Sequence, residues 1–231
     1  RHITYGLTTQ ADYTARNIAT EGLNTYFTVY HHGRELGRIL SGALGQHNVL
    51  NTLAAVAVGM ELNLDFDTVA ASLKDFGGVQ RRFEVVEKSD ELILVDDYGH
   101  HPAEIQATLK TAKEAWPDRR LIVVFQPHRY SRTQSLMKAF WSAFNDADHL
   151  LVTDIYSAGE LPIEGVDACQ IADGIREFGH KEVEHIGNDQ VSDRISRLVK
   201  PGDVVMTLGA GDVWKLGRNL LTTLSQNKND L

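Results

Sequence analysis

The chain has 231 residues, enough for one large or two ordinary domains with a buried core. Its 31 acidic residues outnumber 23 Lys and Arg, and the net charge of -8 argues against a nucleic-acid surface as the main function. Because its apolar runs are too short to cross a membrane and its single cysteine excludes an internal disulfide, we expect a cytoplasmic protein without a nucleic-acid or membrane partner.

The first third of the chain predicts a strand, a hairpin and two helices. The chain begins at Arg1 rather than Met, inside an expected strand, so we expect a fragment of a longer protein. The second helix is expected to stop at Gly77 and Gly78, which we interpret as a cap and a hinge. The expected elements are strand 2–6, hairpin strands 26–30 and 35–40, helix 48–60 and helix 67–75.

After Arg82 the pattern becomes an alternation of apolar, β-branched runs with helical spacing. Such alternation is typical of an α/β fold whose sheet is mostly parallel and Rossmann-like, with helices on both faces. We place a domain boundary near 78–82. The expected elements are hairpin strands 83–86 and 92–95, helix 103–115, strand 121–125, helix 135–144, strand 150–153, helix 168–178, strand 183–186, helix 189–198, strand 204–208 and a helix from 213.

Two polar segments, 96–102 and 125–133, each follow one of the expected strands and precede a helical stretch. They are rich in histidine, arginine and carboxylate side chains. In open α/β sheets, ligands bind at the carboxyl ends of the strands. A hydrophobic core does not need such side chains there, so we interpret the two segments as the walls of one anion-binding site.

Arg129 and Arg132 lie three residues apart at a strand-to-helix turn, and both can point at one ligand. Arginine grips a carboxylate or phosphate through paired N–H donors, and the following helix N-terminus favours an anion. The alternative is a solvated basic loop whose arginines pair with surface acids. Pro127 and His128 directly after a buried strand favour the functional interpretation.

His100 and His101 are adjacent, and adjacent residues of an extended segment project to opposite sides, so one metal ion cannot easily take both. No Cys or His partner lies at zinc spacing, so we predict no metal site. A polar contact from His100 to a ligand is the better interpretation, while His101 before a proline can be structural. Of Asp96 and Asp97, only one is expected to face the ligand; capping of the strand end is the alternative for each.

Three further features of the sequence are an asparagine pair, a glycine-rich segment and the single cysteine. Asn48 and Asn51 share a face at the start of a helix, where an amide pair facing a ligand competes with simple capping. The segment 209–212 predicts a tight turn rather than a phosphate loop, and no G-x-x-x-x-G-K-[ST] motif occurs in the 231 residues. Cys169 has no obvious activating base in the sequence, so we expect an inert thiol.

Four segments together carry a family resemblance: 47–51, 80–84, 96–102 and 125–133. They resemble the Mur ligases, and the second pair resembles the branch that adds L-alanine. The tip 153–160 and the turn 209–212 are also similar to that branch. The resemblance covers essentially the whole chain. It implies that residues 1–80 are the end of a central ATPase-type α/β domain and that residues 81–231 are the C-terminal domain, which brings the amino acid and closes over ATP.

The resemblance implies a reaction and a set of site residues. ATP with Mg²⁺ phosphorylates the carboxylate of UDP-N-acetylmuramate, and the amine of L-alanine attacks the acyl phosphate; the metal ligands are expected mostly outside this chain. Arg82 matches a hinge arginine that reaches the phosphates and acts in catalysis. The implied ATP contacts are Asn48, Asn51, Arg82 and Asp97, and the implied L-alanine contacts are Tyr98, His100, His128, Arg129 and Arg132.

Three other functions stay open. The missing phosphate-loop motif favours a non-enzymatic module that binds a nucleotide or an amino acid. A related ligase that recycles murein tripeptide shares the segment 96–102 in similar form, but is not expected to carry the segment 125–133. A metal-dependent hydrolase built on the histidines is a more distant alternative.

Overall fold

The structure is a computed structural model that describes residues 2–76 and 78–229, with side chains as far as Leu221. The chain forms two compact units, Arg1–Val79 and Gln80–Leu231. The expected cap and hinge falls partly outside the described residues, because Gly77 is not among them; Gly78 has a positive φ of 87°.

The first unit is a four-stranded sheet covered by two helices. The strand order is β1-β2-β3-β4, with β1 parallel to β2 and the other pairs antiparallel. Phe27, Val29 and Ile39 point from the sheet into one core with Leu53 and Val56 of the first helix. The elements are β1 (Tyr5–Gly6), β2 (Tyr13–Glu21), β3 (Asn24–His31), β4 (Arg34–Ser41), α1 (Gln46–Glu61) and α2 (Phe66–Asp75).

The second unit contains a six-stranded sheet in the order β5-β6-β10-β7-β8-β9. The β5–β6 pair is an antiparallel hairpin and every other neighbouring pair is parallel. The elements are β5 (Glu84–Lys88), β6 (Leu92–Asp97), α3 (Pro102–Ala115), β7 (Leu121–Phe125), α4 (Tyr130–Phe140), β8 (His149–Val152), α5 (Ala168–Glu177), β9 (Val183–His185), α6 (Val191–Leu198), β10 (Asp203–Leu208) and α7 (Val213–Asn229).

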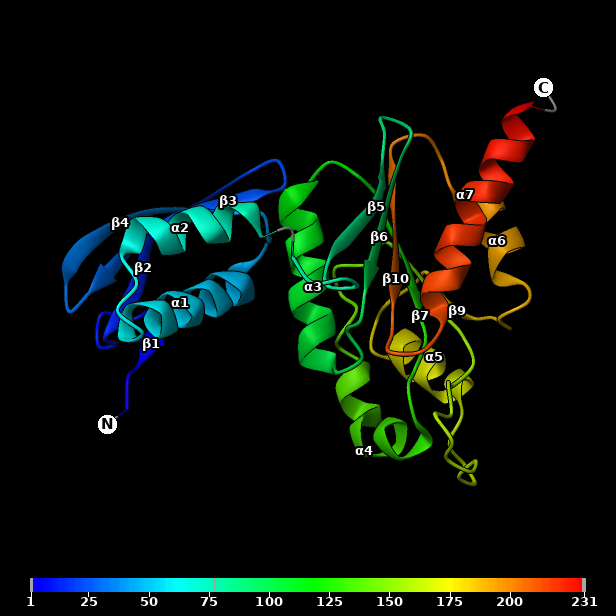
Figure 1. The fold of residues 1–231 in the computed structure, drawn as a ribbon. Coiled ribbons are helices and arrows are strands. Elements are labelled where there is room, and N and C mark those ends of the chain that lie inside the picture. The colour runs from blue at the N-terminus through cyan, green and yellow to red at the C-terminus, as the bar shows by residue number, and fades with distance from the viewer. Residues whose placement is uncertain (1, 77, 230–231) are drawn as a thin grey trace. The chain divides into compact units, whose positions relative to one another are not determined.

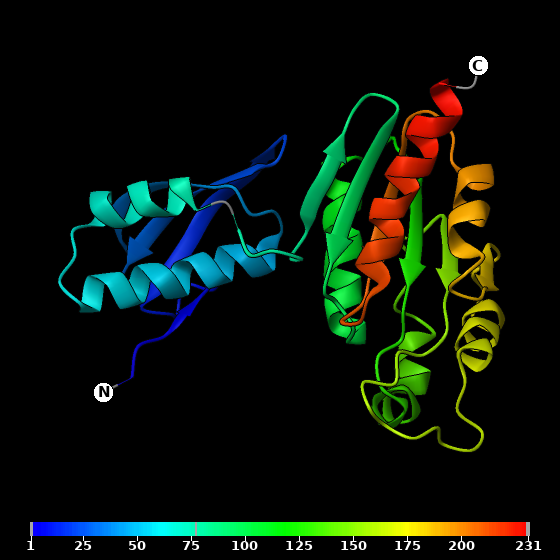
Figure 2. The same ribbon diagram turned by 45° about the vertical axis from the view of Figure 1, so that its right-hand side comes forward.

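The central strands of the second unit divide their side chains between two cores. Ile93 and Val95 of β6 face the core that α3, α4 and α5 cover, whereas Leu92 and Leu94 face the core under α6 and α7. This period of two follows from the pleat of a strand buried on both faces. Helices α3 and α7 accordingly lie on opposite sides of the strands (Figure 1), and α6 accompanies α7 (Figure 2).

The predicted fold class is confirmed: the sheet is mostly parallel, and helices cover both of its faces. Two of the expected elements have the wrong bounds. The helix expected over 135–144 is α4, which starts at Tyr130 and ends at Phe140. Its start is earlier because Arg129 adopts a left-handed φ of 74° that turns the chain directly from the strand end into the helix. The strand expected over 2–6 is paired only at Tyr5–Gly6.

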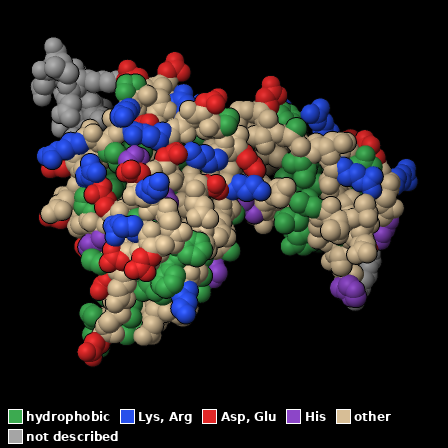
Figure 3. Space-filling model, turned by 180° about the vertical axis from the view of Figure 1, so that it is seen from behind, with side chains coloured by type: hydrophobic (Ala, Val, Ile, Leu, Met, Phe, Trp, Pro, Cys, Tyr) green, Lys and Arg blue, Asp and Glu red, His purple; other side chains and the backbone are tan. Residues whose placement is uncertain are grey.

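Acidic and basic side chains are interspersed on the face of the molecule seen in Figure 3. None of the described helices combines the length and the apolarity needed to cross a bilayer.

Candidate functional site

The polar segments follow strands that run in the same direction and lie in one sheet. Strands β6, β10, β7 and β8 are parallel neighbours, so their carboxyl ends share one edge. The two segments singled out from the sequence therefore reach the same edge of the second unit. A one-residue parallel bridge between His128 and Tyr156 extends the β7–β8 pairing beyond the strands.

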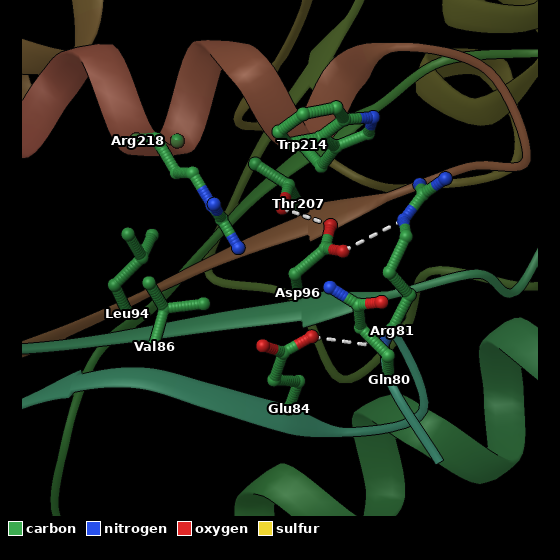
Figure 4. Close-up of a pocket in the computed structure, with 10 residues that line it drawn as sticks. Gln80, Arg81, Glu84, Val86, Leu94, Asp96, Thr207, Trp214 and Arg218 are labelled. Atoms are coloured by element: carbon green, nitrogen blue, oxygen red, sulfur yellow. Dashed lines mark hydrogen bonds and ion pairs between the residues drawn. The ribbon is translucent and has the colours of Figure 1, made fainter.

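Asp96, the penultimate residue of β6, anchors Arg81. Its carboxylate accepts hydrogen bonds from Arg81 Nε at 2.9 Å and from the Thr207 hydroxyl at 2.6 Å (Figure 4). The Arg81 guanidinium also donates to the carbonyls of Gly211 at 3.1 Å and Gly209 at 2.6 Å. Arg81 thus joins the segment before β5 to the turn after β10. Nothing in the sequence distinguishes Arg81 from Arg82 in this way.

Asp97 is 4% exposed and holds two backbone groups. Its carboxylate accepts from the amide of Phe83 at 2.8 Å and from that of Gly99 at 2.7 Å. Burial raises the pKa of this carboxyl group, although the two amides and the charge of Arg82 oppose the shift. Asp97 therefore fixes the backbone at Phe83 and at Gly99.

Arg82 lies at the surface, half-exposed. Its guanidinium carbon is 5.4 Å from the centre of the Tyr98 ring, and Nη1 is 3.7 Å from Glu104 Oε1. Both contacts are of kinds that contribute about 1 kcal/mol or less at exposed sites. Arg82 is therefore weakly held, in contrast to its neighbour Arg81.

Four aromatic rings form a row along the edge, called here the ring row: Tyr98, His100, His128 and Tyr156. The centroid distances along the row are 5.5 Å, 5.9 Å and 5.5 Å. The His128 and Tyr156 rings are stacked with an interplanar angle of 11°. The structure thus brings together three of the residues predicted to surround the amino acid. It adds Tyr156, for which no role was predicted.

Arg132 contacts His128 and not Arg129. Its Nη1 atom lies 3.0 Å from Nδ1 of the His128 ring and donates to the His128 carbonyl at 3.1 Å. Burial lowers the pKa of His128, and the charges of Arg132, His100 and Arg129 lower it further against the opposing charge of Glu160. The imidazole is therefore biased towards its neutral form.

Arg129 faces a carboxylate of the protein. Its Nη1 atom is 3.6 Å from Glu160 Oε1. Glu160 also accepts from the Ser131 amide at 3.0 Å and from the Ser131 hydroxyl at 2.7 Å. Because Arg129 has no side-chain capping bond, Glu160 acts as a remote cap of α4, and the bonds from Ser131 lower its pKa. The two arginines share one turn but have different partners.

Gln126, 1% exposed at the end of β7, holds the start of α7. Its side-chain oxygen accepts from the amides of Asp212 at 3.0 Å and Val213 at 3.2 Å, and its nitrogen donates to Asp212 Oδ1 at 2.9 Å. A Cβ on Gly211 would lie 2.3 Å from that oxygen, so this position requires glycine. The segment 209–212 is thus a turn packed on protein, as expected.

The remaining predicted ligand residues, Asn48 and Asn51, belong to the first unit. Asn51 Nδ2 donates to Asn48 Oδ1 at 3.1 Å, and Asn48 Nδ2 donates to the Leu44 carbonyl at 2.8 Å. The two amides therefore share a helix face and orient each other.

A pocket of about 200 Å³ opens next to Arg81, and Trp214 and Arg218 of α7 line part of it (Figure 4). None of the ligand residues predicted from the sequence lines this pocket. Within the described part of the chain, no group of three or more His, Cys, Asp or Glu side chains is arranged to hold a metal ion.

Cys169 is less isolated than the sequence indicates. Its sulfur lies 3.3 Å from Nδ1 of His185, whose Nε2 is 3.0 Å from Asp154. Burial raises the pKa of the thiol, and the charges of Asp167 and Asp173 raise it further. A base is therefore present, but the surroundings oppose formation of the thiolate.

His101, expected to be structural, caps α3. Its Nδ1 accepts from the Ala103 amide at 3.4 Å, and Glu104 accepts from the His101 amide at 3.2 Å, which together form a capping box. Of the two adjacent histidines, only His100 belongs to the ring row.

Residues 81–211 match the protein-family model described as Mur ligase, glutamate ligase domain. This range contains the ring row and both arginines of α4.

Curated relatives and solved structures extend the similarity over the whole chain. The chain is 51% identical over 225 residues to UDP-N-acetylmuramate–L-alanine ligase of Geotalea uraniireducens, covering 97% of this chain and 49% of the relative. The solved UDP-N-acetylmuramate-alanine ligase of Thermotoga maritima is 28% identical, with a TM-score of 0.83 over 97% of this chain and 48% of that one. A murein peptide ligase of Psychrobacter arcticus, 24% identical with a TM-score of 0.66, shares the fold. The chain spans about half the length of the curated relatives that it matches.

Proposed function

Because the chain belongs to the Mur ligase family, we propose that it forms half of an enzyme that joins L-alanine to UDP-N-acetylmuramate at the expense of ATP, a cytoplasmic step of peptidoglycan precursor synthesis. The observation that carries the proposal is the ring row with Arg129 and Arg132, placed at the carboxyl edge of the sheet. The relatives that match nearly the whole chain bear the name of this activity. A carboxylate-binding site next to imidazoles suits an amino acid as the second substrate.

In this proposal, the second unit contributes the amino-acid side of the reaction. Arg129 and Arg132 bind the α-carboxylate of alanine, and Tyr98, His100 and His128 shape the pocket. Arg82 moves from its weak contacts onto the phosphates of ATP, and Asp97 fixes the backbone next to it. Asn48 and Asn51 contact the adenine end of ATP. Mg²⁺ accompanies ATP, and its ligands are the phosphates and residues outside this chain.

The direct test is ligation by the full-length gene product. With ATP, Mg²⁺, UDP-N-acetylmuramate and L-alanine, phosphate release and formation of the UDP-muramoyl-alanine product are expected, and omission of alanine should abolish product. Replacing alanine by a murein tripeptide, with UDP-N-acetylmuramate still present as the carboxylate substrate, tests the recycling ligase. Nucleotide or alanine binding without any product would favour the non-enzymatic module.

Arg82→Ala tests the division between the two substrates. The substitution should lower turnover, because the phosphoryl group loses a positive charge, and leave the alanine KM nearly unchanged. Arg119→Ala, near the opposite end of the strands, is the matched control. A rise in the alanine KM with unchanged turnover would assign Arg82 to the amino acid instead.

A further inference from the structure

We infer that His100 and His128 present opposite hydrogen-bonding groups to a zwitterionic amino acid. His100 offers an acceptor to the ammonium group, and His128 offers a donor to the carboxylate group. The inference deepens the proposed function and rests on it for the identity of the substrate. The tautomers themselves follow from the partners of the two rings.

The partner of His128 fixes its tautomer. Arg132 Nη1 lies 3.0 Å from Nδ1 of the ring, and a guanidinium can only donate hydrogen bonds. Nδ1 must therefore accept, which leaves the ring proton on Nε2. Protonation of Nδ1 would place two donors face to face beside a positive charge. The stacked Tyr156 ring keeps the imidazole in place, so His128 offers an N–H donor at Nε2.

The partner of His100 fixes the other tautomer. His100 Nδ1 lies 3.0 Å from the carbonyl oxygen of Tyr98, and a carbonyl can only accept. Nδ1 therefore carries the proton, and Nε2 of the neutral ring is left with its lone pair. Glu104 Oε2 lies 3.7 Å from the same Nδ1. His100 is accordingly an acceptor that can also take a proton.

The charged groups around the pair reinforce this difference. Arg132 and Arg129 of α4 face His128, and Glu160 from the loop after β8 opposes them. Glu104 of α3 lies next to His100, and Tyr98 packs edge-on against it. Burial and the arginines lower the pKa of His128, which keeps the donor tautomer neutral at physiological pH. The ring centroids are 5.9 Å apart, so one small molecule can contact both rings.

The arrangement assigns a proton transfer to His100. An ammonium cannot attack an acyl phosphate, because its nitrogen has no lone pair. His100 Nε2 takes one proton and becomes imidazolium, and the amine lone pair forms the C–N bond. The C–O bond to the phosphoryl group breaks with its electron pair on phosphate, which leaves with the second amine proton. His128 Nε2–H holds the carboxylate during these steps.

The tautomers are tested by long-range ¹H–¹⁵N NMR of the imidazoles in this chain, with His128→Gln and His100→Gln for assignment. We expect the Nε2–H pattern for His128 and the Nδ1–H pattern for His100. Arg132→Met should let the pKa of His128 rise towards its ordinary value of about 6.5. His149→Gln, at the amino end of β8, is the control and should change neither ring. An Nδ1–H pattern for His128 in the unsubstituted chain would overturn the inference.

Compounds that carry only one of the two charged groups of alanine, called half-ligands here, test the two histidine rings separately. This test does not require ligation activity. Propionate, which has only the carboxylate, should shift the Nε2 signal of His128, and ethylamine should shift that of His100. L-Alanine should shift both. A response of both rings to the same half-ligand, or of neither ring to alanine, would refute the zwitterion-reading role. This outcome is independent of whether the full-length protein is a ligase.

Kinetics of the full-length protein then assign the roles. His128→Gln keeps an N–H donor at similar reach and should leave the alanine KM within about threefold, whereas His128→Leu should raise it about ten- to a hundredfold. His100→Gln should lower kcat by about a hundredfold or more. An unchanged kcat in His100→Gln would exclude His100 as the base. Absence of alanine ligation in the unsubstituted protein would instead refute the proposed function and leave the NMR result standing.

Discussion

Neighbouring residues at this site have different tasks because their partners differ. Arg81 binds a buried carboxylate and two carbonyls, while Arg82 rests half-exposed on Tyr98. Likewise His101 caps a helix and His100 joins the ring row. At the residue scale, function therefore follows from what each side chain contacts rather than from its type.

The first prediction concerns the arginines of α4. Arg129→Lys and Arg132→Lys in the full-length protein should each raise the alanine KM about ten- to a hundredfold, because a point charge lacks the fork that binds a carboxylate. The ATP KM should not change. Arg197→Lys on α6 is the matched control. A raised ATP KM with an unchanged alanine KM would place these arginines at the nucleotide.

Cys169 should react slowly at neutral pH. Burial and two neighbouring acids raise its pKa, so the thiol stays protonated and the nucleophilic thiolate is rare. The rate of alkylation by iodoacetamide, followed by mass spectrometry, should keep rising above the ordinary thiol pKa of about 8.5. Asp173→Asn should accelerate it. A rate that levels off below that pH would show that His185 activates the thiol after all.

At the scale of elements, the alternation of strands and helices was predictable because each strand carries a β-branched apolar run and each helix an amphipathic pattern. The start of α4 was not, since it depends on the left-handed Arg129 and on Glu160, which is distant in sequence. The ring row could be predicted only in part from the sequence. Two segments supplied three of its rings, but the stacking of Tyr156 depends on the pairing of residues after β7 and β8.

Gln126 offers a test of how firmly one element holds another. Gln126→Met keeps the size of the side chain but leaves two buried amides at the start of α7 without an acceptor. We expect a loss of about 1–3 kcal/mol in the free energy of unfolding of the second unit, measured by urea denaturation. Gln106→Met on α3, whose side chain makes an exposed contact, should cost far less. Equal costs would mean that Gln126 does not clamp the helix.

At the scale of the whole molecule, this chain alone should not catalyse ligation. It lacks a phosphate-loop motif and spans about half the length of its relatives, and phosphoryl transfer depends on positioning and charge neutralisation. A phosphate-release assay with all three substrates should give a background rate, while the full-length protein serves as the positive control. Turnover of about one per second or more, as in ordinary enzymes, would contradict this expectation.

The position of β10 has a consequence for biosynthesis. This strand is the last of the sheet to be translated, yet it lies between β6 and β7 and pairs with both. Until Leu208 has left the ribosome, those two strands each expose an unpaired edge in the middle of the future sheet. Unpaired strand edges can pair with other chains, so we expect the nascent second unit to be prone to aggregation until β10 is in place. Premature termination before β10 would leave an aggregation-prone polypeptide rather than a smaller folded domain.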